Sequence, residues 1–189
     1  VFKTDTSRKN SLEWSPDGKN LLYNISHGGQ GQQATIDICV LNIATKQVRQ
    51  ITQSGKDKSY DPNWCPDNKK IVYYLEKGGG HDQIWLTDIN GSFHINLTND
   101  TITHNYFASW FDDQTILYTQ SPETIMLMNV NNRTRKKIEG INSEHVKYNS
   151  APGKLVYVNS ETDNNVVLYD LKTKKQTILL DGTKMIGIY

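Results

Sequence analysis

The sequence predicts an all-β fold, a β-propeller of four four-stranded antiparallel blades that make a small or incomplete ring. Three observations predict it: one segment recurs four times along 189 residues, each copy is followed by two further short apolar runs, and no stretch has the periodicity of a helix. Repeats of about 40 to 45 residues that each build one small sheet are typical of propeller blades.

The recurring segment is most regular in the first half of the chain. It reads EWSPDGKNLLY from Glu13 to Tyr23 and NWCPDNKKIVY from Asn63 to Tyr73, then SWFDDQTILY up to Tyr118 and YNSAPGKLVY up to Tyr157. The four closing tyrosines are spaced by 50, 45 and 39 residues. We therefore expect a single domain over residues 1–189 with repeats at approximately 12–61, 62–107, 108–147 and 148–183, and the start of a further strand at 184–189.

Each repeat contains four predicted strands. The first ends at the Trp of the segment and the second at its closing Tyr, with a Pro-Asp-Gly or Pro-Asp-Asn turn between them in the first two repeats. Such turns suit a hairpin because Pro presets φ and Gly or Asn tolerates a positive φ. The other two strands are predicted at Ile38–Asn42 and Gln47–Thr52, Ile84–Asp88 and His94–Thr98, Ile125–Asn129 and Arg135–Glu139, and Val166–Asp170 and Gln176–Leu180.

Three tryptophans hold equivalent positions in the repeat. Trp14, Trp64 and Trp110 end the first strand of their repeats, where a large ring can fill the wedge between neighbouring blades, so we expect them in the core. The two cysteines, Cys39 and Cys65, lie at positions that are not equivalent, and a disulfide between them is not expected.

Composition and charge exclude several classes of protein. Lys and Arg total 21 against 20 Asp and Glu, so the chain as a whole offers no general attraction to nucleic acid. No run approaches the length of a membrane span, and the first residues, Val-Phe-Lys-Thr-Asp, lack the basic and apolar regions of a signal peptide. The basic residues near Arg135 and Lys174 fit the protection of exposed sheet edges.

The repeat resembles the TolB-like, WD40-like (PD40) β-propeller family. The resemblance rests on WSPDGKNLLY and WCPDNKKIVYYLEKGGGHDQIWLTDINGSFHINLT, covers nearly the whole chain, and fades in the third and fourth repeats. It implies a periplasmic or extracellular place and a protein partner, with possible association with the cell envelope. The ring can close as four blades, with further blades, or with a second copy of the chain, and these alternatives stay open.

The long loops of the repeats are expected to open on one face of the propeller. They are 24–35, 75–83, 119–124 and 159–165 within repeats, and 53–61, 99–107 and 140–147 between repeats. Four of the five histidines, His27, His81, His104 and His145, fall in these loops. With Asp82, Asp100 or Glu144 they could form a metal or acid–base cluster, but no metal-ligand spacing is present, and polar residues are common in loops. We expect no metal, cofactor or catalytic residue.

Aromatic residues on the same loops favour a protein interface. Tyr60, Tyr106 and Phe107 lie on or near them. The predicted binding residues are His27, Tyr60, His81, Asp82, His104, Tyr106 and His145. The sequence thus favours a non-catalytic protein–protein interaction scaffold. The alternative is the propeller domain of a peptidase or a sugar-acid-processing enzyme, which gates or binds peptide or carbohydrate at the channel mouth.

Overall fold

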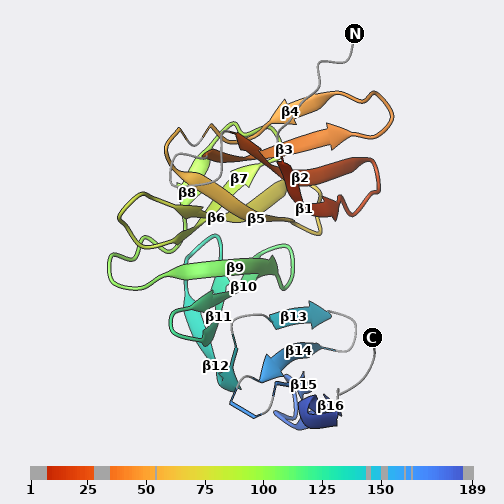
Figure 1. The fold of residues 1–189 in the computed structure, drawn as a ribbon, viewed down its shortest axis with the longest axis vertical. Coiled ribbons are helices and arrows are strands. Elements are labelled where there is room, and N and C mark those ends of the chain that lie inside the picture. The colour runs from red at the N-terminus through yellow and green to blue at the C-terminus, as the bar shows by residue number, and fades with distance from the viewer. Residues whose placement is uncertain are drawn as a thin grey trace. The chain divides into compact units, whose positions relative to one another are not determined.

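The computed structural model describes residues 8–27, 35–53, 55–143, 146–149, 153–159, 161–162 and 164–184. The chain forms two compact units, Val1–Ala108 and Ser109–Tyr189, whose boundary falls within the strand Asn105–Trp110. The strands form four consecutive four-stranded blades (Figure 1). No helix among the described residues is long and apolar enough to cross a membrane.

The N-terminal unit contains blades one and two. Blade one consists of β1 (Arg8–Trp14), β2 (Asn20–His27), β3 (Thr35–Asn42) and β4 (Val48–Gln50), and blade two of β5 (Lys58–Trp64), β6 (Lys70–Glu76), β7 (Gln83–Asp88) and β8 (His94–Asn96). Neighbouring strands within each blade are antiparallel. A single parallel pair, Ile36 with Lys58, joins β3 to β5, so the two blades form one eight-stranded sheet.

Blades three and four are separate four-stranded sheets. Blade three consists of β9 (Asn105–Trp110), β10 (Thr115–Gln120), β11 (Thr124–Asn129) and β12 (Arg135–Asn142), and blade four of β13 (Val146–Asn149), β14 (Lys154–Asn159), β15 (Asn165–Asp170) and β16 (Gln176–Leu180). A short 3-10 helix, Gly182–Lys184, follows β16. Lys184, where the further strand at 184–189 was predicted to begin, is the last residue of this 3-10 helix. Residues 185–189 lie outside the described residues.

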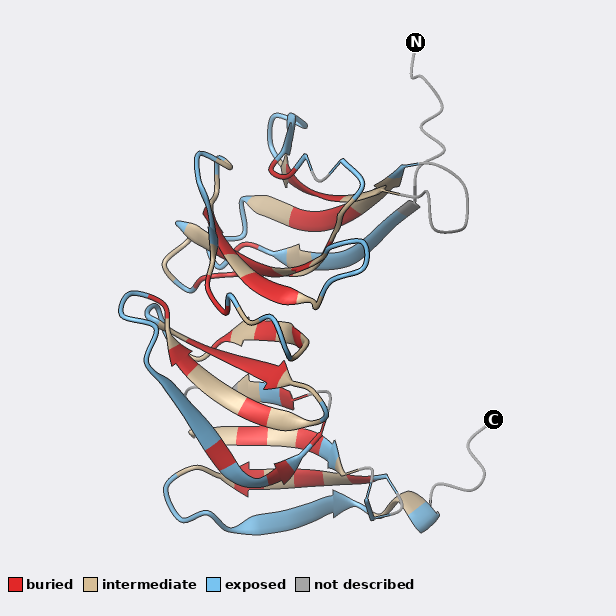
Figure 2. Ribbon diagram, turned by 90° about the vertical axis from the view of Figure 1, so that its left-hand side faces the viewer, coloured by how far each residue is buried: buried red, intermediate tan, exposed pale blue. Residues whose placement is uncertain are grey.

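The four strands predicted for each repeat are confirmed, and most of their bounds agree within three residues. The alternation of buried and less buried positions is clearest in β15, where every second residue is buried (Figure 2). This is the pattern of a strand that buries one face more deeply than the other. No sheet closes on itself among the described residues, so the predicted four-bladed ring is not confirmed.

A bulge interrupts the first strand of three blades at the same place. Ser11, Asp61 and Phe107 have φ values of 52°, 42° and 53°, and each lies three residues before the tryptophan of its blade. The strand register shifts at this point in β1 and in β5. Bulges re-aim neighbouring side chains and are common beside functional sites.

A core cluster packs blade one against blade two. Leu22, Ile38 and Val40 of blade one meet Trp64, Ile71, Tyr73 and Leu75 of blade two. Two hydrogen bonds from polar side chains reinforce the contact. The buried Asn24 amide donates to the carbonyl of Ser59 at 2.7 Å, and Glu13 accepts the N–H of Trp64 at 2.8 Å.

Two of the three tryptophans are in the core as predicted. Trp64 is 5% exposed and Trp110 is 8% exposed, but Trp14 is 59% exposed. The expectation that Trp14 fills a wedge is therefore wrong for the described residues. Trp64 is buried because its ring packs against blade one, the blade that precedes it in the chain. Among the described residues no blade covers the corresponding side of blade one, so the Trp14 ring stays exposed.

Blades three and four pack in the same manner in the C-terminal unit. Leu117, Ile125, Ile138 and Ile141 of blade three meet Val146, Leu155, Tyr157, Val167 and Tyr169 of blade four. Tyr157 and Tyr169 thus belong to the core, like the strand-closing tyrosines Tyr23, Tyr73 and Tyr118. Both cysteines of the chain are buried, and neither forms a disulfide.

Candidate functional site

Two long loops of blade two bring three predicted site residues together. His81 and Asp82 precede β7, and His104 precedes β9. The two imidazole rings meet edge to face with centroids 4.6 Å apart. Nδ1 of His104 lies 3.0 Å from Oδ2 of Asp82, and the same nitrogen lies 3.2 Å from the backbone nitrogen of Asp82. The long-loop end of blade two is therefore a polar cluster.

His104 has a partner in both of its protonation states. When Nδ1 is unprotonated it accepts the backbone N–H of Asp82, and when it carries a proton it donates to the Asp82 carboxylate. The His104 side chain is 43% exposed, so solvent reaches it.

His81 is the less satisfied member of the pair. Its Nδ1 is buried and has no hydrogen-bond partner among the described residues. A buried polar nitrogen without a partner costs free energy, so a bound water, ion or partner group that hydrogen-bonds to it would stabilise the cluster.

Gln83 was not among the predicted site residues, but it fixes the shape of this cluster. Its Oε1 accepts the N–H of Asp100 at 2.7 Å, and its Nε2 donates to the carbonyl of Thr103 at 3.1 Å. Oε1 also accepts the hydroxyl of Thr98, whose oxygen accepts the N–H of Ile84. Blade one has the same arrangement, in which Thr52 donates its hydroxyl to Asp37 and accepts the N–H of Ile38. The sequence feature that could have indicated Gln83 is therefore the Thr that lies two residues after the last strand in both blades.

A row of four aromatic rings lies at the same end of blade two. Tyr60 stacks on Tyr74 with centroids 5.2 Å apart and planes 24° apart. Tyr74 meets Phe107 edge to face at 5.9 Å, and Phe107 meets Tyr106 in the same way at 4.8 Å. All four side chains are half-buried. Tyr74 was not predicted because it directly follows Tyr73, and alternation along β6 turns it to the other face of the blade.

Carboxylates surround the stacked pair of tyrosines. Burial raises the pKa of Tyr60, and the nearby Glu76 carboxylate raises it further. Burial also raises the pKa of Tyr74, as do the carboxylates of Asp61 and Asp82. Lys58 offsets part of this negative charge through an ion pair with Glu76 at 2.9 Å. Both phenols therefore stay protonated at neutral pH and can donate hydrogen bonds.

We call this region the blade-two surface: His81, Asp82, His104, Tyr60, Tyr74, Tyr106 and Phe107. It unites five of the seven predicted binding residues. His27 lies at the end of β2 and is exposed, with no hydrogen bond or ring contact to the cluster among the described residues. His145 and Glu144 lie outside the described residues. In the part of the chain that is described, no three His, Cys, Asp or Glu side chains are arranged to hold a metal ion.

Comparison with known families finds one match that spans most of the chain. The model of the TolB beta propeller domain, PD40, matches residues 4–179. Among curated proteins, none matches the sequence significantly.

Several solved structures share the fold at low sequence identity. TolB from Acinetobacter baumannii superposes with a TM-score of 0.72 at 20% identity, over 93% of this chain and 45% of that one. An oligogalacturonate lyase in complex with manganese gives 0.80 at 12% identity, over 99% and 57%. A puromycin-hydrolyzing peptidase of Mycobacterium tuberculosis gives 0.70 at 11% identity, over 92% and 31%. The chain spans about half the length of the first two proteins, and these likenesses show the fold alone.

Proposed function

Because the chain belongs to the PD40 family of TolB β-propeller domains, we propose that it is a non-catalytic scaffold that binds a protein partner through the blade-two surface. The observation that carries the proposal is the continuous row of four rings from Tyr60 to Tyr106, which lies beside a polar cluster. Tyrosine combines a large apolar ring with a polar tip, and it is enriched among residues that dominate binding energy.

The packing of the rings supports a pre-formed binding surface. Each ring already contacts another, so the aromatic row is held in place before a partner arrives, and binding loses less side-chain entropy. The four side chains remain half-buried rather than fully buried, which leaves part of each ring for a partner. The Asp82 and His104 side chains add polar groups beside the row.

The family resemblance supports a proposal on the partner and its location. We propose a protein partner in the periplasm or outside the cell, with association with the cell envelope, as the resemblance to TolB suggests. We also propose a second copy of the chain, which would complete the ring, as a partner.

Alanine substitutions on the blade-two surface test the proposal. Tagged wild-type chain, Tyr60→Ala and Tyr106→Ala are used to capture partners, which are quantified by mass spectrometry, and thermal unfolding verifies that each variant is folded. Phe93→Ala is the matched control, because Phe93 is an exposed aromatic residue outside the blade-two surface, in the turn before β8. We expect both tyrosine variants to lose partners that the control retains. If their captured proteins equal those of the wild type, the proposal fails.

The contact of His104 with Asp82 and the unpartnered His81 favour a second candidate function. In it, the chain is the propeller domain of a peptidase or a sugar-acid-processing enzyme and binds peptide or carbohydrate at this surface. Calorimetric titration with oligogalacturonate and with a short proline-containing peptide tests this candidate. Binding that His104→Gln and His81→Gln abolish would support it, and the absence of binding by either ligand would exclude it.

A further inference from the structure

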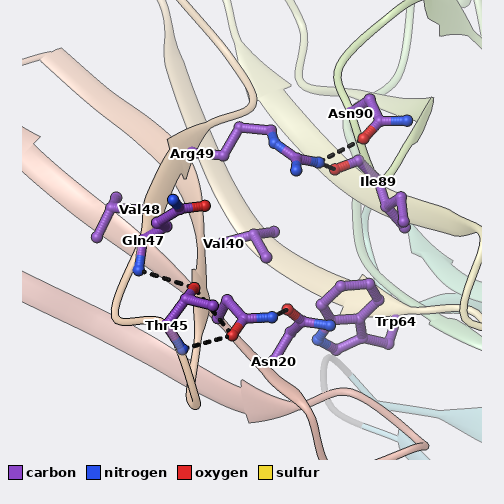
Figure 3. Close-up of a pocket in the computed structure, with 10 residues that line it drawn as sticks. Asn20, Val40, Thr45, Gln47, Val48, Arg49, Trp64, Ile89 and Asn90 are labelled. Carbon is purple, nitrogen blue, oxygen red and sulfur yellow. Dashed lines mark hydrogen bonds between the residues drawn. The ribbon is translucent and has the colours of Figure 1, made fainter.

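A pocket lies in the wedge between blades one and two, at the end of the strands away from the blade-two surface. Its volume is about 440 Å³. It opens where β2 begins at Asn20 and β3 ends at Asn42, whereas the long loops lie at the opposite ends of these strands. Residues of both blades line it, among them Val40 and Arg49 of blade one and Trp64, Ile89 and Asn90 of blade two (Figure 3).

Arg49 bridges the two blades over this pocket. It pairs with Val40 across β3 and β4, so both side chains lie on the face of blade one that packs against Trp64. Nη1 of Arg49 donates to the carbonyl oxygen of Ile89 at 3.2 Å and to Oδ1 of Asn90. Both bonds use the same nitrogen, and Figure 3 shows the guanidinium anchored to blade two by that side alone.

The charge of Arg49 is not neutralised by a neighbouring carboxylate. Within the described residues, Arg49 makes no ion pair, and its Nε and Nη2 make no hydrogen bond. Asp88 is close in sequence to the contact, but its carboxylate accepts the N–H groups of Asn90 and Ser92. The guanidinium therefore keeps hydrogen-bond donors for a further acceptor.

The rest of the lining suits an acceptor with a negative charge. It contains the side-chain amides of Asn20, Asn42, Gln47 and Asn90 and no Asp or Glu. Val40 and Trp64 add apolar surface. A site with one cation, several amide donors and no anion favours a carboxylate, which accepts hydrogen bonds from Arg in a planar arrangement.

The other blades show that the fold does not require these residues. The place of Arg49, opposite the equivalent of Val40, is taken by Ile95, Lys136 and Thr177 in the next three blades. The cross-strand pair Asn20 and Asn42 corresponds to a Lys–Asp pair in blade two and again in blade four, at Lys70 with Asp88 and at Lys154 with Asp170. The polar lining is thus particular to this wedge.

We propose that this pocket binds a carboxylate group, with Arg49 as its counter-ion and the surrounding amides as additional donors. The carboxylate can belong to a free small acid or to a peptide, at its C-terminus or on an acidic side chain. This binding site is separate from the blade-two surface, so it does not depend on the proposed function.

Nuclear magnetic resonance of the ¹⁵N-labelled chain tests the proposal. The indole N–H of Trp64 is the reporter, assigned with Trp64→Phe, because Trp64 lines the pocket and its Nε1 has no hydrogen-bond partner among the described residues. The probes are N-acetylglycine, acetate and the α-amide of N-acetylaspartate, which keeps its side-chain carboxylate, with N-acetylglycinamide as the uncharged analogue. We expect saturable shifts of the Trp64 signal with the carboxylates and none with N-acetylglycinamide.

Substitutions separate a specific contact from general charge attraction. Arg49→Gln should weaken N-acetylglycine binding at least about tenfold, because a charge-assisted hydrogen bond is lost. Lys46→Gln removes the same charge from an exposed residue that does not line the pocket, and should weaken binding less than about twofold. Tighter binding of the acetylated amino acids than of acetate would identify a peptide source, and equal binding a free acid.

Three results would overturn the proposal. They are equal shifts with N-acetylglycinamide, unchanged affinity in Arg49→Gln, and an equal loss in Lys46→Gln. Arg49→Lys keeps the charge without the planar fork and should bind with intermediate affinity, provided that its spectrum retains the dispersion of the folded chain. Tyr60→Ala and Tyr106→Ala should bind N-acetylglycine like the wild type, which keeps this test independent of the partner experiment.

Discussion

Glu13 of blade one accepts a hydrogen bond from the backbone N–H of Trp64 of blade two, with Oε2 and N 2.8 Å apart. The carboxylate thus secures the end of β5 at the point where the tryptophan ring enters the core between the blades. It is one of several polar contacts between the two blades, together with those of Asn24 and Arg49, and it should contribute to their docking.

Removal of the Glu13 carboxylate should destabilise the chain. Glu13→Ala leaves the Trp64 N–H without its acceptor, and we expect a loss of about 1 to 3 kcal/mol in the free energy of unfolding, measured with urea. Glu13→Gln keeps an acceptor oxygen and should recover part of the loss. Equal stability of Glu13→Ala and the wild type would show that the bond contributes nothing.

The tryptophans of blades one and two should differ in their contribution to stability. Trp64→Ala should cost about 3 to 5 kcal/mol, because the ring is buried and a cavity remains between the blades. Trp14→Ala should cost well under half of that, since the Trp14 ring is mostly exposed. The comparison uses the same urea titration, and a similar cost at both positions would mean that Trp14 is covered in solution.

Gly91 lies in the turn between β7 and β8, where an alanine cannot be accommodated. It has a φ of +69°, and a Cβ at this position would lie 2.6 Å from the carbonyl oxygen of Ile51. Gly91→Ala should therefore lower the melting temperature by several degrees, because the backbone strain of about 1 kcal/mol is joined by a steric clash. Gly18→Ala is the control, since Gly18 has a similar φ with no atom near its missing Cβ. A drop no larger than that of the control would contradict the clash.

Both cysteine thiols should be unreactive in the folded chain. Burial raises the pKa of Cys39 to about 11 and that of Cys65 to about 12. The thiolate is the reactive form, so a thiol reagent at pH 8 should modify neither residue until the chain unfolds. The reaction is followed by absorbance in native buffer and in urea, and rapid modification of one thiol in native buffer would contradict the burial of that residue.

The repeat made most of the fold predictable. The closing tyrosines and the apolar runs located four strands in each of four blades, because strand burial with period two leaves a signal in the residues themselves. The repeat pattern did not predict the exposure of Trp14. Trp14 holds the same position in its repeat as Trp64, but its burial depends on whether another blade covers the face of blade one on which it lies, and a repeat pattern does not encode that.

The candidate site was predictable only in part. Histidines and tyrosines on the long loops were identified as residue types, and Tyr60, His81, Asp82, His104 and Tyr106 do gather at one end of blade two. Tyr74 was missed because it lies within a strand. Gln83 ends the predicted loop 75–83, but only the structure shows that it bonds to Thr98, Asp100 and Thr103. The pocket beneath Arg49 was missed for a further reason, since its lining comes from two blades.

The sequence by itself determined the blade, its turns and the family, because these depend on local alternation, turn residues and a repeated segment. The tertiary structure alone decided which side chains meet. The contacts of His81 with His104, of Tyr60 with Tyr74 and of Arg49 with Ile89 join residues that are 14 to 40 positions apart. Such meetings depend on how strands pair and how blades pack, and no pattern along the chain records that geometry.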